Sequence, residues 1–261
     1  MQDYICCFVD VLGAKAQMEE EGFAEGLANL LEMIENNKPC RPLIKECSDE
    51  IKKHHPHFAN KSYEEIEEIL TLMAPELQFS GSEKRVFSDS IVIINQVMES
   101  NFRAAFFEVV SMASILHLVA INTVRCLVRG GITYGKLHVG EKLILGPALI
   151  QAQIIESQEA IYPRIVLDEV VVQKFKDSSW LIKPPVTQDQ MDGRMYVKPV
   201  TFDKETDTCG LYSSMVKNFA VMTEKAKNQS NPTVMQKYTW FANEINKGFE
   251  ELGAQEKLCV A

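Results

Sequence analysis

The stretch Phe8-Val9-Asp10-Val11-Leu12-Gly13 decides the fold, because it places one carboxylate in an apolar run that ends at a glycine. The run from residue 4 to residue 12 predicts a buried first strand. A carboxylate in such a strand is costly to bury unless a hydrogen-bond donor, a cation or a metal ion compensates it. Asp10 is therefore the first candidate for a functional residue.

A second acidic residue, Asp89, repeats this pattern in Val86-Phe87-Ser88-Asp89-Ser90-Ile91-Val92-Ile93. Residues 84–95 predict two strands that meet at Ser88-Asp89-Ser90, or one strand that is interrupted there. Carboxylates on neighbouring strands can chelate Mg²⁺ or Mn²⁺, which prefer oxygen ligands and leave positions open for phosphate. The alternative is that each Asp only forms a turn or caps a helix.

The turn after the first strand predicts an anion site. Gly13 and Ala14 turn the chain from a strand into a helix, and a helix N-terminus with exposed backbone N–H groups favours phosphate. We expect the backbone of Val11, Leu12, Gly13 and Ala14 to hold the phosphates of a nucleotide, with Lys15 as a further charge.

A third block, Val128-Arg129-Gly130-Gly131-Ile132-Thr133-Tyr134-Gly135, combines an arginine with three glycines in a predicted strand. The glycines permit close approach by a ligand or a neighbouring chain segment. Arg129 is unusual in a core strand unless it pairs with a carboxylate or a phosphate. Glu156, in a later apolar helix, could pair with Arg129 or with Arg164.

The predicted elements follow the order β-α-α-β-β-α-β-β-α-β, which indicates an α+β domain with a mixed sheet and helices on one face. We expect residues 1–170 to form the core and residues 171–261 to form a C-terminal α/β elaboration. The other predicted strands are residues 124–134, 136–145 and 164–167. Helices are predicted over residues 22–36, 102–123 and 233–252. Two more helices are predicted from their start signals, which are a capping box of Ser62 and Glu65 and the pair Gly146-Pro147.

Composition excludes several classes of protein. The 261 residues carry a formal charge of −9, which argues against binding to a nucleic-acid backbone, although one local basic pocket is compatible with it. Seven cysteines without a CxxC pair indicate a reducing compartment. The N-terminus lacks the basic region of a signal peptide, and the apolar runs fall short of a membrane span. We therefore expect a cytoplasmic protein without a membrane partner.

The histidines are not expected to bind a metal ion. We expect His54, His55 and His57 to be solvated and His117 to be a core residue.

Taken in order, these blocks resemble the catalytic domain of class III adenylate/guanylate cyclases. The resemblance covers roughly residues 4–167. The matching blocks are Phe8-Val9-Asp10-Val11-Leu12-Gly13, Phe87-Ser88-Asp89-Ser90, Arg129-Gly130-Gly131-Ile132-Thr133-Tyr134-Gly135 and Gly146-Pro147-Ala148-Leu149-Ile150-Gln151-Ala152.

The resemblance implies the mixed sheet of that family, of the ferredoxin-like or polymerase-palm type, and a head-to-tail homodimer with sites at the interface. It implies two divalent ions, Mg²⁺ or Mn²⁺, held by Asp10, Val11 and Asp89 against a nucleoside triphosphate. Asp10, Asp89 and Arg129 would be the catalytic residues.

One departure from the family pattern concerns the last helix. Purine cyclases carry an Asn and an Arg there, and the matching positions are Ile150 and Ile154. In this respect the chain looks closer to the pyrimidine cyclases of bacterial Pycsar anti-phage systems. That resemblance implies conversion of UTP or CTP to cUMP or cCMP, which a separate effector protein would sense.

Two alternatives remain open at this level. A catalytically silent nucleotide-binding module, kept for dimerisation or sensing, would also account for Ile150 and Ile154. Another two-metal phosphoryl-transfer enzyme on a polymerase-palm scaffold would use the same carboxylates.

Overall fold

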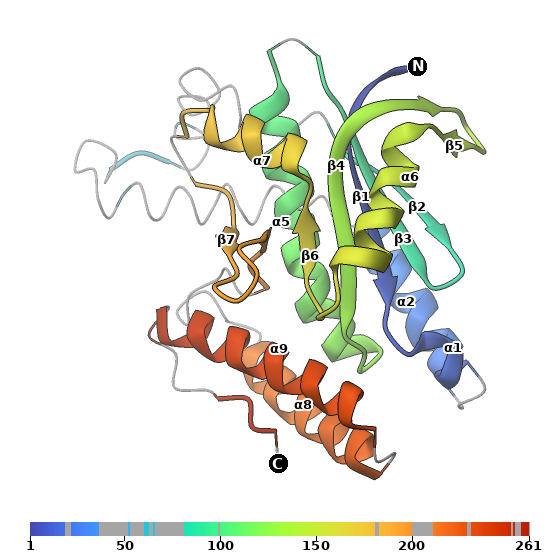
Figure 1. The fold of residues 1–261 in the computed structure, drawn as a ribbon, viewed down its shortest axis with the longest axis vertical. Helices are drawn as coiled ribbons and strands as arrows, with labels where there is room; N and C mark the ends of the chain where they lie inside the picture. Colours follow the sequence, from blue (N-terminus) through green and yellow to red (C-terminus); the bar gives the residue numbers. More distant parts are fainter. Residues whose placement is uncertain are drawn as a thin grey trace.

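The computed structural model describes most of the chain. The described residues are 1–18, 22–36, 52, 60–62, 65, 81–98, 100–180, 183–199, 211–228, 231–251, 253 and 257–260. The predicted α+β class is confirmed, since one mixed sheet is covered by helices (Figure 1).

The sheet has eight strands, and all of its pairings are antiparallel except that of β4 with β6. Strand β5 pairs with β4 outside the main path. The strand order along that path is β2 (Glu83–Phe87), β3 (Ser90–Gln96), β1 (Gln2–Val11), β4 (Val128–Val139), β6 (Ile165–Leu167), β8 (Met195–Val197) and β7 (Val186–Gln188).

Strand β1 lies near the centre of the sheet and is buried on both faces. Ile5 and Val9 belong to one hydrophobic cluster, and Tyr4 and Phe8 belong to another. Because successive side chains of a strand point to opposite faces, a strand covered on both sides reads as a continuous apolar run. This explains why β1 shows no alternation of apolar and polar residues.

Helices cover both faces of the sheet, which corrects the prediction that they lie on one face. Helices α2 (Phe23–Asn36), α5 (Phe102–Thr123) and α7 (Glu169–Lys176) pack into the cluster that contains Ile5 and Val9. Helix α6 (Pro147–Ile154) packs on the other face, against β1 and β4, and lies in front of the sheet in Figure 1.

Glycines in β4 explain how α6 reaches that face. A Cβ atom added at Gly131 would lie 2.5 Å from the carbonyl oxygen of Ala152 and 2.7 Å from Cβ of Ile155. A Cβ atom added at Gly130 would lie 2.4 Å from the carbonyl oxygen of Phe8. The two glycines thus accommodate the protein's own strand and helix, rather than a ligand.

Helix α5 is long and apolar enough to cross a membrane by length and composition, contrary to the prediction that the apolar runs fall short of a membrane span. It is the one such helix in the described part of the chain, and 89% of its most apolar window is buried. The helix packs on the sheet, so its apolar surface is what a central core helix requires.

The hairpin after α5 differs from its predicted bounds. Strand β4 continues through Val139, and β5 is limited to Ile144–Leu145. The turn lies at Gly140, where the N–H group donates to the carbonyl oxygen of Leu143 at 2.8 Å. Gly130 and Gly131 do not end the strand, because they lie against β1 and α6 rather than in a turn.

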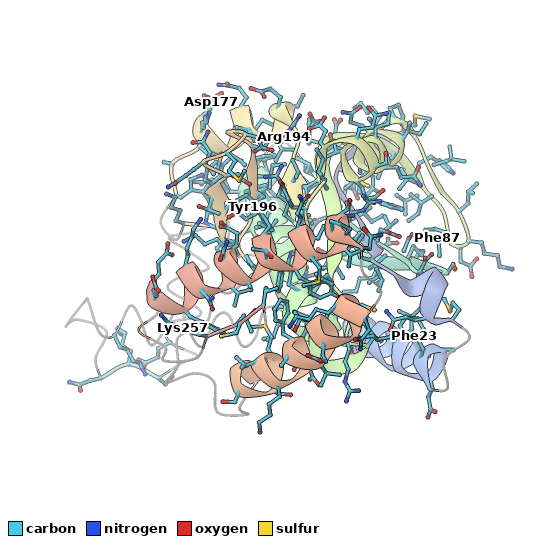
Figure 2. The ribbon with its side chains drawn as sticks, turned by 60° about the horizontal axis from the view of Figure 1, so that its bottom comes forward. Phe23, Phe87, Asp177, Arg194, Tyr196 and Lys257 are labelled. Carbon is cyan, nitrogen blue, oxygen red and sulfur yellow. The ribbon has the colours of Figure 1, made fainter. Side chains whose placement is uncertain are left out.

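Two helices, α8 (Leu211–Asn228) and α9 (Pro232–Glu251), pack beside the end of α5 and the start of β4 (Figure 1). Tyr196 of β8 donates a hydrogen bond to Glu244 of α9, and Figure 2 shows it beside that helix. Trp240 and Phe241 of α9 are buried in the same cluster as Tyr196. The C-terminal residues therefore add strands β7 and β8 to the sheet, and they add the helices α8 and α9 at the end of the sheet where β4 begins.

Two predictions fall at the edge of the described residues. The predicted capping box forms, since the Ser62 N–H group donates to Oε2 of Glu65 at 2.7 Å and the Glu65 N–H group donates to Oγ of Ser62 at 3.2 Å. Most of the helix that it begins lies outside the described residues, as do His54, His55 and His57.

Candidate functional site

Strand pairing brings Asp10 and Asp89 together. Asp10 is paired with Ser90 across β1 and β3, and Asp89 lies in the turn between β2 and β3. The Val11 N–H group donates to the carbonyl oxygen of Asp89 at 3.1 Å. Ser88 takes a positive φ of 59° in this tight turn. Two acidic residues that are 79 positions apart in the sequence (89 − 10) thus share one end of the sheet.

The electrostatics of Asp10 favour a bound cation. Burial raises the pKa of Asp10, and the nearby Asp89 carboxylate raises it further, whereas Arg129 and a hydrogen bond from Ser90 lower it. Since the net direction is upward, the protein's own partners do not fully compensate the negative charge. A divalent cation between the two carboxylates would compensate it.

The donors fit Mg²⁺ or Mn²⁺. Asp10 and Asp89 offer hard carboxylate oxygens, and the backbone carbonyl group of Val11 is the third predicted ligand. Among the described residues, no group of three or more His, Cys, Asp or Glu side chains could enclose a metal ion. An open site of two carboxylates is the arrangement in which Mg²⁺ keeps water or phosphate oxygens as further ligands.

Arg129 faces Asp10 across the β1–β4 pair, because the two residues are register partners. Its Nε atom lies 4.0 Å from Oδ2 of Asp10 and 2.6 Å from Oε1 of Glu156. At 2.6 Å the second contact is a close ion pair, although the N–H direction departs from that of a hydrogen bond. Of the two predicted partners, Arg129 and Arg164, Glu156 therefore pairs with Arg129.

Glu156 lies in a π-helical turn, η3 (Ile155–Glu159), that continues α6. Burial raises its pKa, Arg129 lowers it, and Asp10 raises it again. Such turns are rare and occur mostly as single-turn insertions, frequently at functional sites. Asp10, Arg129 and Glu156 thus form one coupled group in which one guanidinium lies between two carboxylates.

The turn after β1 offers fewer phosphate donors than predicted. The N–H groups of Val11 and Leu12 already donate to the carbonyl oxygens of Asp89 and Leu127, at 3.1 Å and 2.8 Å. Helix α1 (Ala14–Gln17) has only four residues, which is too short for an appreciable helix dipole. Gly13, with φ of 82°, and Ala14 remain as the predicted backbone donors, so side-chain cations must supply charge at this turn.

Lys237 of α9 is a cation near this group that was not among the predicted site residues. Burial lowers its pKa, Arg129 lowers it further, and Glu156 raises it. The available signal was its position in Lys237-Tyr238-Thr239-Trp240-Phe241, directly before aromatic residues of a predicted amphipathic helix.

Arg164, the alternative partner predicted for Glu156, has a structural role. It is only 1% exposed and pairs with Asp189 and Asp192, which lie in the turn between β7 and β8. Ile150 and Ile154 lie on α6 and are 59% and 37% exposed. Neither isoleucine side chain can bind ribose or phosphate. Among the described residues, Arg129 and Lys237 are the cations that lie near the carboxylate of Glu156.

Comparison with known proteins gives similarity at the level of solved structures. No protein-family model matches the sequence, and no curated protein matches it. The catalytic core of a rhodopsin-guanylyl cyclase with converted specificity, in complex with ATPαS, aligns over 75% of this chain and 95% of its own, with 13% identity and a TM-score of 0.41.

Two further structures show similar values. A guanylyl cyclase aligns over 77% of this chain and 93% of its own, with 11% identity and a TM-score of 0.38. A bacterial light-regulated adenylyl cyclase aligns over 82% of this chain and 58% of its own, with 14% identity and a TM-score of 0.36.

Proposed function

We propose that this protein is a nucleotidyl cyclase, which converts a nucleoside triphosphate to its 3′,5′-cyclic monophosphate and pyrophosphate. The observation that carries the proposal is the placement of Asp10 and Asp89 at one end of the sheet, with the pKa of Asp10 raised by burial and by Asp89. This arrangement favours bound divalent cations and, with them, a polyphosphate substrate. The ordered sequence blocks that resemble class III cyclases support the same reaction.

In this reaction the ribose 3′ oxygen forms a bond to the α-phosphorus, the bond from that phosphorus to the bridging oxygen of pyrophosphate breaks, and the hydroxyl proton leaves to solvent. Two divalent ions bound by Asp10, Val11 and Asp89 would supply charge neutralisation and Lewis acidity. Arg129 contributes a fixed positive charge beside the reacting phosphate, and Glu156 holds its guanidinium in place.

We also propose that the active form is a homodimer. Ile150 and Ile154 are four residues apart on α6, so they share one face of the helix and are both exposed. Leu145, directly before the helix, is also exposed. Exposed apolar groups of this kind mark interaction surfaces. A second copy of the chain that covers this face would place further side chains near Asp10.

The substrate base and the biological setting are the finer parts of the proposal. Resemblance to the Pycsar pyrimidine cyclases, which also lack the usual pair on this helix, supports UTP or CTP as substrate. It also supports a cytoplasmic role in anti-phage defence, with a separate effector protein that responds to the cyclic nucleotide.

The direct test is to incubate the purified protein with each of the four nucleoside triphosphates, in Mn²⁺ or in Mg²⁺, and to identify the products by mass spectrometry. We expect a cyclic monophosphate and pyrophosphate, with a pyrimidine preferred. The Asp10→Asn/Asp89→Asn double variant is the control and should give no product. Turnover by that double variant would refute the assignment.

The second candidate is a silent nucleotide-binding module, which the isoleucines at positions 150 and 154 favour. It predicts that nucleotide binds with a measurable affinity and that no product forms with any base. A third outcome, linear diesters or oligonucleotides among the products, would indicate a phosphoryl-transfer enzyme of the polymerase-palm type instead.

A further inference from the structure

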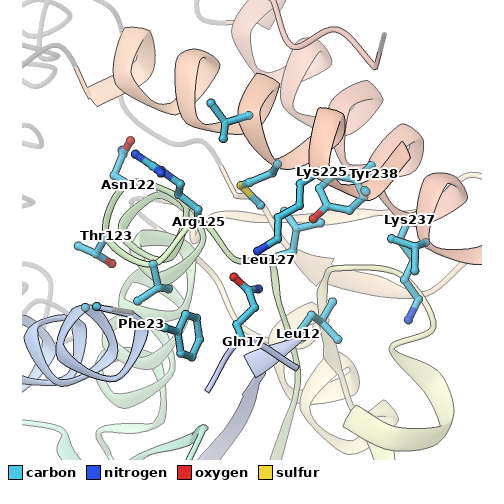
Figure 3. A pocket seen from close by; sticks show the side chains of 18 residues that line it. Leu12, Gln17, Phe23, Asn122, Thr123, Arg125, Leu127, Lys225, Lys237 and Tyr238 are labelled. Carbon is cyan, nitrogen blue, oxygen red and sulfur yellow. The ribbon is translucent and has the colours of Figure 1, made fainter. Parts of the chain in front are cut away.

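A cleft of about 470 Å³ lies between the turn after β1 and the C-terminal helices. Figure 3 shows its lining side chains, which come from the turn after β1, the start of α2, the end of α5, and helices α8 and α9. Its volume is in the range of small-molecule sites. Leu12 and Gly13 belong to its lining, so the cleft begins two residues after Asp10.

The charge of the cleft is opposite to that of the whole chain. Arg125, Lys225 and Lys237 line it, and no acidic side chain is among the described residues that do so. The chain as a whole has a formal charge of −9. A concentration of positive charge in one concave site of an acidic protein favours an anionic ligand and raises its local concentration.

The two lysines approach the turn from the C-terminal helices. Lys225 of α8 extends across the cleft toward Gln17 (Figure 3). Lys237 of α9 lies close enough to Arg129 and Glu156 for their charges to act on it, so it connects the cleft with the candidate metal site. Arg125, the third cation of the lining, donates from its Nε atom to Oδ1 of Asn218 at 3.2 Å.

We propose that this cleft binds the polyphosphate end of the nucleotide and that Lys225 and Lys237 are its phosphate-binding residues. This inference rests on the proposed function, since it takes the carboxylates as the site of the α-phosphate. The nucleotide runs from Asp10 past Gly13, and its terminal phosphates lie between the two lysines. Lysine serves this purpose as a compact point charge with three N–H donors.

The competing occupant is a free phosphorylated effector that binds independently of the substrate. The location of the cleft favours the substrate instead. The Val11 and Leu12 N–H groups are occupied by carbonyl oxygens, so a triphosphate bound at this turn needs side-chain cations. Lys225 and Lys237 are the lysines that line the cleft next to Leu12 and Gly13.

The test measures binding of sodium tripolyphosphate by calorimetry in metal-free buffer, for the full-length wild type and for Lys225→Gln, Lys237→Gln and the double variant. Lys217→Gln is the matched control, because Lys217 is an exposed lysine of α8 outside the cleft. We expect each cleft variant to lose about 10- to 100-fold in affinity, which corresponds to one charged hydrogen bond. The double variant should lose more than either, and the control should bind as the wild type does.

A second arm adds UTP or CTP to the wild-type complex and asks whether it displaces tripolyphosphate. Displacement supports a shared site, and simultaneous binding overturns the assignment to the substrate. Absence of tripolyphosphate binding, or equal affinity in the wild type and the double variant, overturns the proposal as well. Circular dichroism and thermal unfolding confirm that each variant is folded. None of these measurements requires turnover, so they remain decisive if the cyclase assay fails.

Discussion

Nε of Arg129 lies 2.6 Å from Oε1 of Glu156, so an ion pair joins the central strand β4 to the π-helical turn after α6. The same nitrogen lies 4.0 Å from Oδ2 of Asp10. Glu156 is buried and Arg129 is partly buried, and the pKa of Glu156 is raised by burial and lowered by Arg129. Glu156 therefore acts on the site through the position of Arg129.

This relationship predicts a non-additive double-mutant cycle. Arg129→Gln should lower kcat by about 10²- to 10³-fold, as expected when one donor to developing charge is removed. Glu156→Gln should lower kcat by only about tenfold and leave KM nearly unchanged. The double variant should be no slower than Arg129→Gln alone, because Glu156 has no role without its partner. Additive losses in kcat would show that Glu156 contacts the substrate independently.

Metal binding predicts a stability effect that does not depend on activity. Mn²⁺ should raise the Tm of the wild type, because an ion that binds only the folded state stabilises it. Asp89→Asn should lose most of this increase. In metal-free buffer the same variant should be at least as stable as the wild type, since the Asp89 carboxylate raises the pKa of Asp10 by repulsion.

Glu141→Gln serves as the control for charge removal, because Glu141 is exposed in the turn between β4 and β5. It should keep the full Mn²⁺ response. An equal response in Asp89→Asn and the wild type would mean that the ion binds elsewhere.

The glycines of β4 predict a packing effect. In Gly131→Ala the new methyl group would meet backbone and side-chain atoms at 2.5 and 2.7 Å, so α6 must move away from the sheet. We expect a loss of at least about 1–3 kcal/mol in the free energy of unfolding, as for other overpacked sites. Gly140→Ala is the control, because its methyl group would meet the carbonyl oxygen of Leu143 at an ordinary 3.6 Å. Urea unfolding measures both, and similar losses would argue against close packing as the cause.

The buried ion pair of Arg164 with Asp189 predicts a large loss of stability when the arginine is removed. Arg164→Met should cost about 3–5 kcal/mol, because the buried Asp189 carboxylate loses its cation. Adding Asp189→Asn should recover part of that loss. Arg194→Gln is the control, since its pair with Glu159 is more exposed and should be worth about 1 kcal/mol or less. No recovery in the double variant would refute the charge explanation.

Much of the sheet could be predicted because its strands carry strong local signals. The apolar run ending at Gly13, the pair of strands around Asp89 and the long apolar α5 all depend on short-range patterns. Their order in the sequence then limited the sheet to few arrangements. The placement of Asp10 beside Asp89 follows from this, because Asp10 lies near the end of the apolar β1 and Asp89 lies directly before the apolar β3.

The remaining features depend on contacts that are distant in the sequence. Helix α8 was not predicted, although its buried residues Met215, Phe219, Met222 and Ala226 have helical spacing, because polar residues between them mask the pattern. Which face of the sheet α6 covers depends on how Gly131 meets Ala152. The proximity of Lys237 to Arg129 requires α9 to return to the start of β4, and no local pattern encodes that.

The buried His117 predicts a pH dependence of stability. It lies on α5 with its ring 5.8 Å from that of Phe241, and neither of its nitrogens has a hydrogen-bond partner among the described residues. Burial lowers the pKa of His117 from 6.5 to about 3. Between these two values the unfolded chain binds a proton that the folded protein does not, so stability falls as the pH falls.

The matching variants are His117→Leu, which removes the buried group, and His138→Leu, which removes an exposed one. Denaturant unfolding between pH 7.5 and pH 5 should show the wild type losing up to about 1.4 kcal/mol per pH unit below pH 6.5 relative to His117→Leu. His138→Leu should follow the wild type, because it leaves His117 in the core. Parallel curves for the wild type and His117→Leu would mean that His117 takes up its proton in the folded protein, and that the core between α5 and α9 admits water.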